Sequence, residues 1–218
     1  MTPNAIGAVV NHVADRIIGM PIIGPRVAID GPDGAGKTHF AEALAAALQN
    51  RRRPVARISI DDFHNVRAVR YRQGRHSPLG FWEDSYNYSR FRSDVLEPFA
   101  PQGSRRFRRA SYSHVTDEIL DPPFETADPA AILIVDGIFL HRVELRAQWD
   151  LTVFLDVAFT ETARRMALRD GTSPDPDHPS MRRYVEGQRE YFRQSQPQQR
   201  ATILVDNNNL HAPGILRG

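Results

Sequence analysis

The distribution of apolar and polar positions along the chain predicts strands and helices in alternation. Five short runs are almost wholly apolar, as expected for parallel strands that are buried on both faces. These runs cover residues 26–30, 54–60, 131–135, 151–156 and 201–206. Apolar residues at helical spacing predict helices over 3–19, 38–50, 88–99, 160–169 and 181–195. We therefore expect an α/β fold of three layers, with helices covering both faces of a five-stranded parallel sheet.

Three segments do not fit this alternation and are expected to carry function. Residues 64–85 are rich in Arg, Gly, Pro and aromatic side chains and read as a long loop, and residues 104–130 read as a polar excursion. Loops of this length in a compact domain tend to bind ligands, so 64–130 is predicted to hold the acceptor-binding insertions. The Pro- and Asp-rich segment 170–181 is predicted to be a lid. Residues 1–22 are predicted to hold an N-terminal helix that extends the core or contacts another subunit, which leaves a homo-oligomer open.

Composition narrows the class of protein. The chain has 218 residues, about the length of one domain, so 1–218 is expected to form a single domain. It is 41% hydrophobic and contains no cysteine, which excludes a disulfide framework and a thiolate nucleophile. No apolar run approaches the ~20 residues that a membrane span needs, and the N-terminus lacks a signal-peptide pattern. We expect a cytoplasmic protein that binds no membrane.

Charge gives little support for a nucleic-acid partner. The formal net charge is only +2, too balanced to indicate a duplex-binding protein. Arginine clusters at 51–53 and 105–109 could contact RNA, but such clusters are more often solvated surface. We therefore expect no nucleic-acid partner.

A glycine-rich segment carries the most specific motif. Residues 31–38 read GPDGAGKT and match G-x-x-x-x-G-K-[ST], the phosphate-binding P-loop, between a predicted strand and a predicted helix. Glycines let backbone N–H groups surround phosphate oxygens, and the helix N-terminus adds partial positive charge. Lys37 is the only lysine among 28 basic residues, and a compact ammonium suits such a cradle better than a planar guanidinium. The predicted ATP contacts are Gly31, Asp33, Gly34, Ala35, Gly36, Lys37, Thr38 and His39.

Two further residues are candidates for holding Mg²⁺. The Thr38 hydroxyl follows the P-loop lysine, and Asp136 follows the apolar run 131–135. An acidic residue at such a strand end acts on the metal directly or through water, although a turn-forming role beside Gly137 is the alternative. A GTPase would also need an N-K-x-D segment, which a chain with one lysine cannot supply. A small-molecule kinase using ATP and Mg²⁺ is the class that fits best.

The acceptor is expected at the same edge of the sheet. Asp61 and Asp62 follow the second predicted strand, and ligands of open parallel sheets bind beyond the carboxyl ends of the strands. One carboxylate there could orient an acceptor hydroxyl and take its proton. Aromatic residues in 64–88 suit a ring-shaped acceptor, or equally a small satellite core. Arg165 and Arg169, on the helix before the lid, suit stabilisation of the transferred phosphoryl group, with a solvated helix face as the alternative.

Together these motifs resemble the uridine kinase-like branch of the phosphoribulokinase/uridine kinase family. The resemblance runs from about residue 24 to 208, through VAIDGPDGAGKT, SIDDFH, SPLGFWEDSYNYSRFRSDVLEPF, ILIVDGIFL, WDLTVFLD and ARRMALRD. It implies that Asp61 is the catalytic base, that Asp84 meets the acceptor, and that Arg165 and Arg169 act beside the lid. His64 stands where a tyrosine is usual, Asp136 where glutamate is common, and the lid lacks an arginine-rich run.

The resemblance implies an ATP-dependent kinase that acts on a small nucleoside-like acceptor, first of all on the 5′-hydroxyl of uridine or cytidine. Related kinases act on pantothenate, nicotinamide riboside, glycerate or sugar phosphates, and a nucleotide-binding regulatory protein is a further alternative. The predicted catalytic residues are Asp61, Lys37, Arg165 and Arg169. The predicted acceptor contacts are Asp61, Asp62, His64, Asp84, Tyr86, Tyr112 and His114, and the predicted metal ligands are Thr38 and Asp136.

Overall fold

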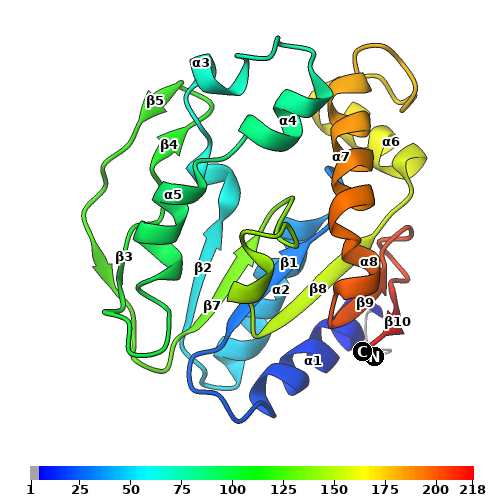
Figure 1. The fold of residues 1–218 in the computed structure, drawn as a ribbon. Helices are drawn as coiled ribbons and strands as arrows, with labels where there is room; N and C mark the ends of the chain where they lie inside the picture. Colours follow the sequence, from blue (N-terminus) through cyan, green and yellow to red (C-terminus); the bar gives the residue numbers. More distant parts are fainter. Residues whose placement is uncertain (1–4) are drawn as a thin grey trace.

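A six-stranded sheet forms the centre of the computed structural model, which describes residues 5–218 (Figure 1). The strand order is β10-β9-β8-β1-β7-β2. Five strands run parallel and confirm the five predicted runs: β1 (Arg26–Asp30), β2 (Val55–Ser59), β7 (Ile132–Asp136), β8 (Leu151–Asp156) and β9 (Ile203–Asp206). The sixth, β10 (Gly214–Arg217), pairs antiparallel with β9 and was not predicted. Its four residues are mostly exposed, so no burial pattern marks them.

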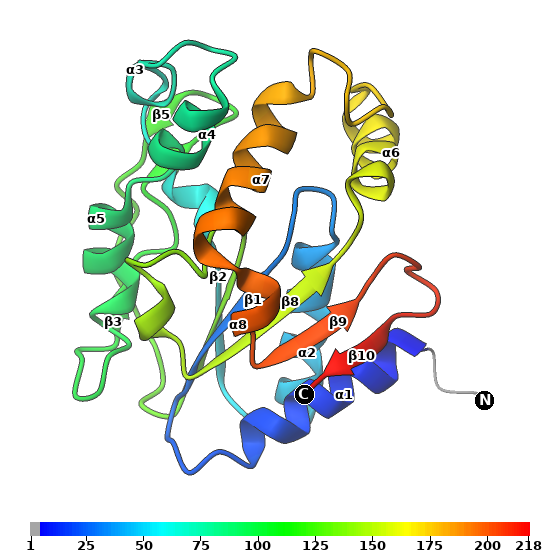
Figure 2. The same ribbon diagram turned by 45° about the vertical axis from the view of Figure 1, so that its right-hand side comes forward.

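Helices cover both faces of the sheet, as the three-layer prediction requires (Figures 1 and 2). Helices α1 (Ala5–Ile18) and α2 (Lys37–Asn50) pack on one face, where they share a buried cluster with Val27 and Ile29 of β1. The opposite face carries α7 (Arg182–Ser195) and the 64–130 insertion, and Ala28 of β1 points into that cluster. Residues 3 and 4 of the predicted N-terminal helix lie outside the described residues.

Helix α6 (Phe159–Asp170) follows β8, and α8 (Pro197–Arg200) precedes β9. A short 3-10 turn, η3 (Arg146–Gln148), precedes β8. None of the helices in residues 5–218 is both long enough and apolar enough to cross a membrane.

The insertion is more ordered than its sequence indicates. A 3-10 turn, η1 (Ile60–Phe63), is followed by α3 (Arg67–Arg70), α4 (Pro78–Asp84), α5 (Tyr88–Phe91) and a π-helical turn, η2 (Arg92–Leu96). Two small antiparallel pairs follow, β3 (Arg106–Phe107) with β6 (Glu125–Thr126) and β4 (Tyr112–Ser113) with β5 (Glu118–Ile119). The prediction of a long loop over 64–85 missed α3 and α4, because helices of one or two turns are too short to show a period.

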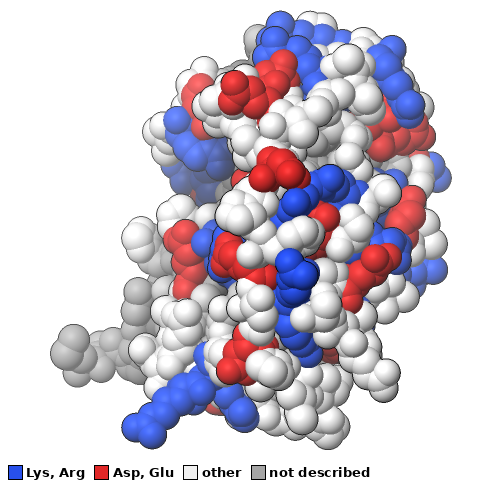
Figure 3. All heavy atoms as spheres, turned by 90° about the vertical axis from the view of Figure 1, so that its left-hand side faces the viewer, with Lys and Arg blue, Asp and Glu red and all other residues white. Residues whose placement is uncertain are grey.

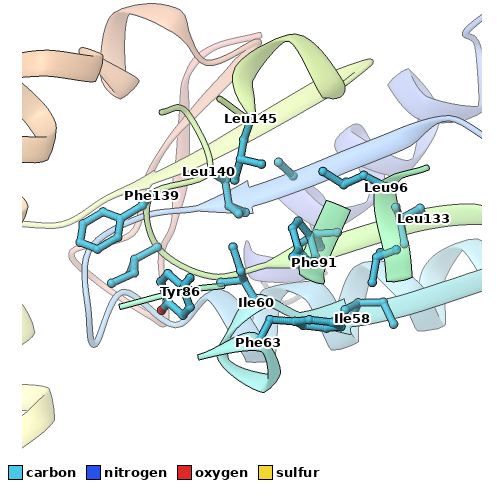
Figure 4. Packing of buried hydrophobic residues seen from close by; sticks show 14 of the residues in the cluster. Ile58, Ile60, Phe63, Tyr86, Phe91, Leu96, Leu133, Phe139, Leu140 and Leu145 are labelled. Carbon is cyan, nitrogen blue, oxygen red and sulfur yellow. The ribbon is translucent and has the colours of Figure 1, made fainter. Parts of the chain in front are cut away.

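Aromatic side chains attach the insertion to the sheet. Phe63 and Phe91 lie edge-to-face with ring centroids 5.2 Å apart, in the same cluster as Leu133 of β7. Figure 4 shows this cluster, with Tyr86 and Phe139 at one end of it. The packing holds the insertion against one face of the sheet. Its first part, from His64 to Tyr86, follows the carboxyl end of β2, which is where a ligand of this fold would bind.

The arginine cluster at 105–109 lies on the outer side of the insertion, together with acidic side chains. Arg108 forms an ion pair with Asp121, and Arg109 pairs with Glu125 at 2.6 Å. Figure 3 shows positive and negative side chains interspersed over the face of the molecule that carries the insertion. These ion pairs favour the reading of the cluster as solvated surface, and the absence of a nucleic-acid partner stays a prediction.

Candidate active site

The loop between β1 and α2 has the backbone geometry of a phosphate cradle. Gly34 and Gly36 have φ values of 75° and 89°, in the left-handed region that favours glycine. Two carbonyl groups of the loop are held from outside: Gly34 O accepts from Arg165 at 3.3 Å, and Ala35 O accepts from Asn207 Nδ2 at 2.7 Å. With these carbonyls directed outward, the first N–H groups of α2 remain available to an anion.

The predicted nucleotide contacts lie on this loop and on the first turn of α2. The Lys37 ammonium is buried and donates to the carbonyl of Pro32 at 2.8 Å, so it lies folded over the loop. The backbone N–H of Asp33 donates to Gln188 Oε1 at 2.7 Å, which ties the loop to α7. Burial raises the pKa of the Asp33 carboxyl. His39 lies at the exposed start of α2, directly after Thr38.

Thr38 and Asp136 meet as the metal prediction requires. The Thr38 hydroxyl donates to Asp136 Oδ2 at 3.0 Å, and the Asp136 side chain is 1% exposed. The other oxygen, Oδ1, is buried without a hydrogen-bond partner in the described part of the chain, although Arg57 Nε lies 3.3 Å away. Burial raises the pKa of Asp136, and Arg57 and Thr38 act in the opposite direction. A hydroxyl beside a carboxylate with an unused oxygen suits Mg²⁺, so the donor set fits the ion.

Asp61 lies in η1, directly beyond the carboxyl end of β2, and its side chain is oriented by a buried tyrosine. The Tyr86 hydroxyl donates to Asp61 Oδ1 at 2.6 Å. Burial, followed by the nearby Asp61 charge, raises the pKa of Tyr86 well above 10, so the phenol stays protonated and remains a donor. His64 contacts the backbone oxygen of Asp61 through Nδ1 at 2.6 Å, and burial lowers the His64 pKa.

A cavity of about 340 Å³ brings the two halves of the site together. Asp33 of the phosphate loop lines it on one side and Asp61 on another. Its remaining walls come from the insertion, the end of α6 and the start of α7. Of the predicted site residues, it is lined by Asp33, Asp61, His64, Tyr86, His114 and Arg169. The ring of His114 lies 5.4 Å from that of His64, so the two imidazoles lie together at the cavity wall.

Three predicted acceptor residues lie outside the lining of this cavity. The buried Asp84 carboxylate accepts from Arg72 Nε at 3.0 Å and from Gln73 at 2.9 Å. Tyr112 is buried, and its hydroxyl bonds to Asp117. The backbone oxygen of Asp62 accepts from the N–H of Ser111 at 2.9 Å. Their roles as direct acceptor contacts stay predictions.

The two predicted arginines of α6 lie in different settings. Arg165 donates to Glu161 at 2.7 Å and to the carbonyls of Asn207 and Asn208 at 2.7 and 2.9 Å, besides its bond to the phosphate loop. In this conformation Arg165 supports the phosphate loop through its hydrogen bond to the Gly34 carbonyl. Arg169 lines the cavity, and within residues 5–218 its one ion pair is with its neighbour Asp170, at 2.7 and 2.8 Å. It is the better placed of the two to reach a transferred phosphoryl group.

A buried hydrogen-bond network lies behind the phosphate loop. Asp30, at the end of β1, is fully buried and accepts from the backbone N–H of Gly31 at 2.7 Å. The same carboxylate bonds to Tyr191 of α7 and to His141, whose Nδ1 lies 2.7 Å away. Asp30 could have been noticed in the sequence as an acidic residue at the end of a predicted strand. Nothing in the sequence marked His141 and Tyr191, because their shared partner Asp30 lies far away along the chain.

Family comparison agrees with this geometry. The sequence model of the phosphoribulokinase/uridine kinase family matches residues 26–174. This chain belongs to that family. The match covers the phosphate loop, Asp61, the insertion and Asp136, and it ends in the predicted lid. Membership is therefore established over the segments that build the site.

Two curated relatives of this chain are named pantothenate kinases. A pantothenate kinase of Rhodopseudomonas palustris (strain BisA53) is 36% identical over 178 residues, covering 72% of this chain and 53% of the relative. A second, from strain BisB18, is 36% identical over 124 residues, covering 55% of this chain and 36% of the relative. The chain thus spans about half or less of the length of these curated relatives.

A solved structure shares the fold across nearly the whole chain. It is described as a possible uridine kinase from Bacillus stearothermophilus, with a TM-score of 0.71 and 21% sequence identity. The alignment covers 89% of this chain and 96% of that one. At this identity the likeness supports the architecture and leaves the acceptor open.

Proposed function

We propose that this family member is a kinase that transfers the γ-phosphate of ATP to a hydroxyl group of a small molecule. The observation that carries the proposal is the shared cavity, which is lined both by Asp33 of the phosphate loop and by the Tyr86-oriented carboxylate of Asp61. A donor phosphate in the cradle and an acceptor hydroxyl at Asp61 would then be neighbours. Such positioning supplies much of the rate enhancement in phosphoryl transfer.

Each residue has one task in this mechanism. Asp61 accepts the proton of the acceptor hydroxyl, and the hydroxyl oxygen of the acceptor forms a bond to the γ-phosphorus. The bond from that phosphorus to the β–γ bridging oxygen breaks at the same time, and ADP leaves. Lys37 and the N–H groups at the start of α2 bind the phosphate oxygens. Thr38 and Asp136 would hold Mg²⁺, which supplies further neutralisation of phosphate charge when it is bound. Arg169, at the cavity wall, stabilises charge on the transferred group.

The acceptor is the finer part of the proposal. The resemblance in sequence favours the 5′-hydroxyl of uridine or cytidine, whereas the curated relatives are named for pantothenate. Uridine, cytidine and pantothenate each carry a primary hydroxyl, the group from which Asp61 would take a proton. Nicotinamide riboside, glycerate and sugar phosphates belong to the same chemical set.

ADP release measured over a panel of these acceptors tests the proposal. We expect release that depends on one class of acceptor and on Mg²⁺, and that Lys37→Ala abolishes without lowering the melting temperature by more than a few degrees. Tight ATP binding with no acceptor-stimulated release would instead favour a nucleotide-binding regulatory protein. Lys37→Ala turning over at the wild-type rate would overturn the placement of the donor phosphate.

A further inference from the structure

The end of the cavity formed by the insertion contains an arginine whose hydrogen-bonding capacity is only partly used. Arg70, the last residue of α3, lines the cavity, and its side chain is 13% exposed. One nitrogen donates to the Tyr112 hydroxyl at 3.3 Å and lies 3.5 Å from Asp117. Its Nε is buried and has no hydrogen-bond partner within residues 5–218. A buried donor without a partner is destabilising, so a ligand that supplies an acceptor atom there is favoured.

A second guanidinium reinforces the positive charge at this end. Arg183 of α7 also lines the cavity, and it is largely buried. Its hydrogen bonds go to the carbonyls of Arg75 and Ser77, both at 3.1 Å, and of Arg70, at 3.3 Å. Carbonyl oxygens satisfy its donors without cancelling its charge. The Tyr71 ring lies between the two groups, 5.5 Å from the Arg70 guanidinium and 5.0 Å from that of Arg183.

Three carboxylates line the cavity, those of Asp33, Asp61 and Asp170, and none of them pairs with Arg70 or Arg183 in the described part of the chain. The carboxylate that pairs with Arg70, at 3.5 Å, belongs to Asp117. Asp170 pairs with Arg169, and Asp61 is engaged by Tyr86 next to the phosphate loop. Asp117 is not part of the cavity lining, and it also pairs with Arg67, at 3.2 Å. The imidazoles of His64 and His114 carry no negative charge. Positive charge therefore dominates the insertion end, and negative charge lies at the end where the hydroxyl would react.

We infer that the acceptor carries an anionic group, a carboxylate or a phosphate, which Arg70 binds while the reacting hydroxyl lies at Asp61. This inference rests on the proposed kinase function and narrows its acceptor class. The planar guanidinium offers Nε and a terminal nitrogen as a paired donor, the geometry that suits a carboxylate or phosphate. Tyr112 and Asp117 hold Arg70 in place from outside the cavity. A neutral nucleoside could offer only uncharged acceptor atoms to Nε, which form weaker hydrogen bonds with a guanidinium than a carboxylate or phosphate does.

Matched acceptor pairs test the inference, because the two members of each pair differ only in the anion. Suitable pairs are pantothenate with panthenol, glycerate with glycerol, and ribulose 5-phosphate with ribulose, with uridine as a neutral nucleoside. We expect kcat/KM to favour the anionic member of one pair at least tenfold. Activity with pantothenate or glycerate identifies a carboxylate, and activity with the sugar phosphate identifies a phosphate. Equal use of both members, or preference for uridine, overturns the inference.

Arg70→Gln removes the charge and keeps most of the side-chain length. We expect its kcat/KM for the anionic acceptor to fall by about tenfold to a hundredfold, the range for a lost charge-assisted hydrogen bond, with the KM for ATP unchanged. The rate with the neutral member should stay within about twofold, which a merely structural defect would not allow. Arg70→Lys, which keeps a charge, should retain part of the preference. A rise in the KM for ATP alone would overturn the assignment.

Arg67→Gln is the matched control on the same helix. Arg67 is 64% exposed, pairs with the same Asp117 and does not line the cavity. Its substitution should leave the preference for the anion unchanged, and an equal loss in both variants would contradict a direct role of Arg70.

If no acceptor is phosphorylated, acceptor binding is tested instead, by measuring the melting temperature of the ADP-bound protein with and without each member of a pair. Stabilisation by an anionic member alone, lost in Arg70→Gln, supports the anion site although the kinase function has failed. Stabilisation by both members or by neither overturns the inference.

Discussion

Replacing Asp61 by asparagine tests the assignment of the base with little change in shape. The Tyr86 hydroxyl would still donate to the side-chain oxygen that it now contacts at 2.6 Å, but the acceptor side would present an NH₂ group or an oxygen that cannot take a proton. A positioned general base contributes about 10²- to 10⁴-fold to a rate, so we expect kcat of Asp61→Asn to fall within that range. Affinity for ATP should be retained, because Asp61 is separate from the phosphate loop.

The stability of this variant should change little. A hydrogen bond to a charged group contributes about 1.5–3 kcal/mol and a neutral one about 1 kcal/mol, so the exchange costs about 1 kcal/mol. For a chain of this length that is a fall in Tm of about 2–4 °C. A larger fall would mean that lost activity reflects unfolding.

Single-turnover transfer with saturating ATP and the best acceptor is the assay, since it isolates the chemical step from product release. Asp62→Asn is the comparison, and we expect a loss below tenfold because its carboxylate does not line the cavity. A loss below tenfold for Asp61→Asn, or an equal loss at Asp62, would refute the assignment of the base.

Three further substitutions probe other parts of the site. Tyr86→Phe removes the hydroxyl that donates to Asp61 and that stays protonated at every pH used for an assay. We expect kcat to fall about tenfold and ATP binding to be retained. An unchanged kcat would show that the hydroxyl does not position the base. Gly34→Ala places a Cβ at φ 75° and only 2.8 Å from a carbonyl of α6, so ATP binding measured by calorimetry should weaken more than tenfold. The control is Gly74→Ala, at φ 97° in open space, which should affect only stability. Burial raises the pKa of Asp136, so the folded state holds that proton more tightly than the unfolded chain, and ionised Asp136 destabilises the fold at neutral pH. Asp136→Asn should therefore raise the Tm measured without magnesium. The gain in Tm should shrink as the pH falls from the raised pKa of Asp136 toward the pKa of an unfolded aspartate, about 3.9. The variant should also lose Mg²⁺-dependent turnover, and a lower Tm at pH 7 would contradict this reasoning.

The sequence was most informative where a local pattern decides the structure. The buried parallel strands have an apolar signature of their own, and the phosphate loop depends on glycine and lysine at fixed spacing, so Lys37 and Thr38 could be placed from short segments. Asp61 and Asp136 could be expected at one edge because parallel strands all end there.

Side chains whose partners come from distant segments were out of reach. The resemblance implied that Asp84 meets the acceptor, and the sequence could not show that Arg72 and Gln73 of the insertion engage its carboxylate. Arg70 was one arginine among many, and only the packing of α3 against the cavity distinguishes it from Arg67. Strand β10 was missed because pairing with β9, rather than burial, defines it.

The way in which Arg183 holds the insertion bears on how such a protein could change its acceptor. Arg183 donates its hydrogen bonds to residues 70–77 through backbone oxygens, which every amino acid provides, and its guanidinium also lies 5.0 Å from the Tyr71 ring. Apart from Tyr71, side chains in that loop can therefore be exchanged without removing these contacts, provided that the main chain keeps its path. The nucleotide loop lies on a separate part of the chain and is untouched by such exchanges. Redesign of the acceptor preference would therefore begin with the side chains of residues 70–77, where substitutions leave both the phosphate loop and the backbone contacts of Arg183 in place.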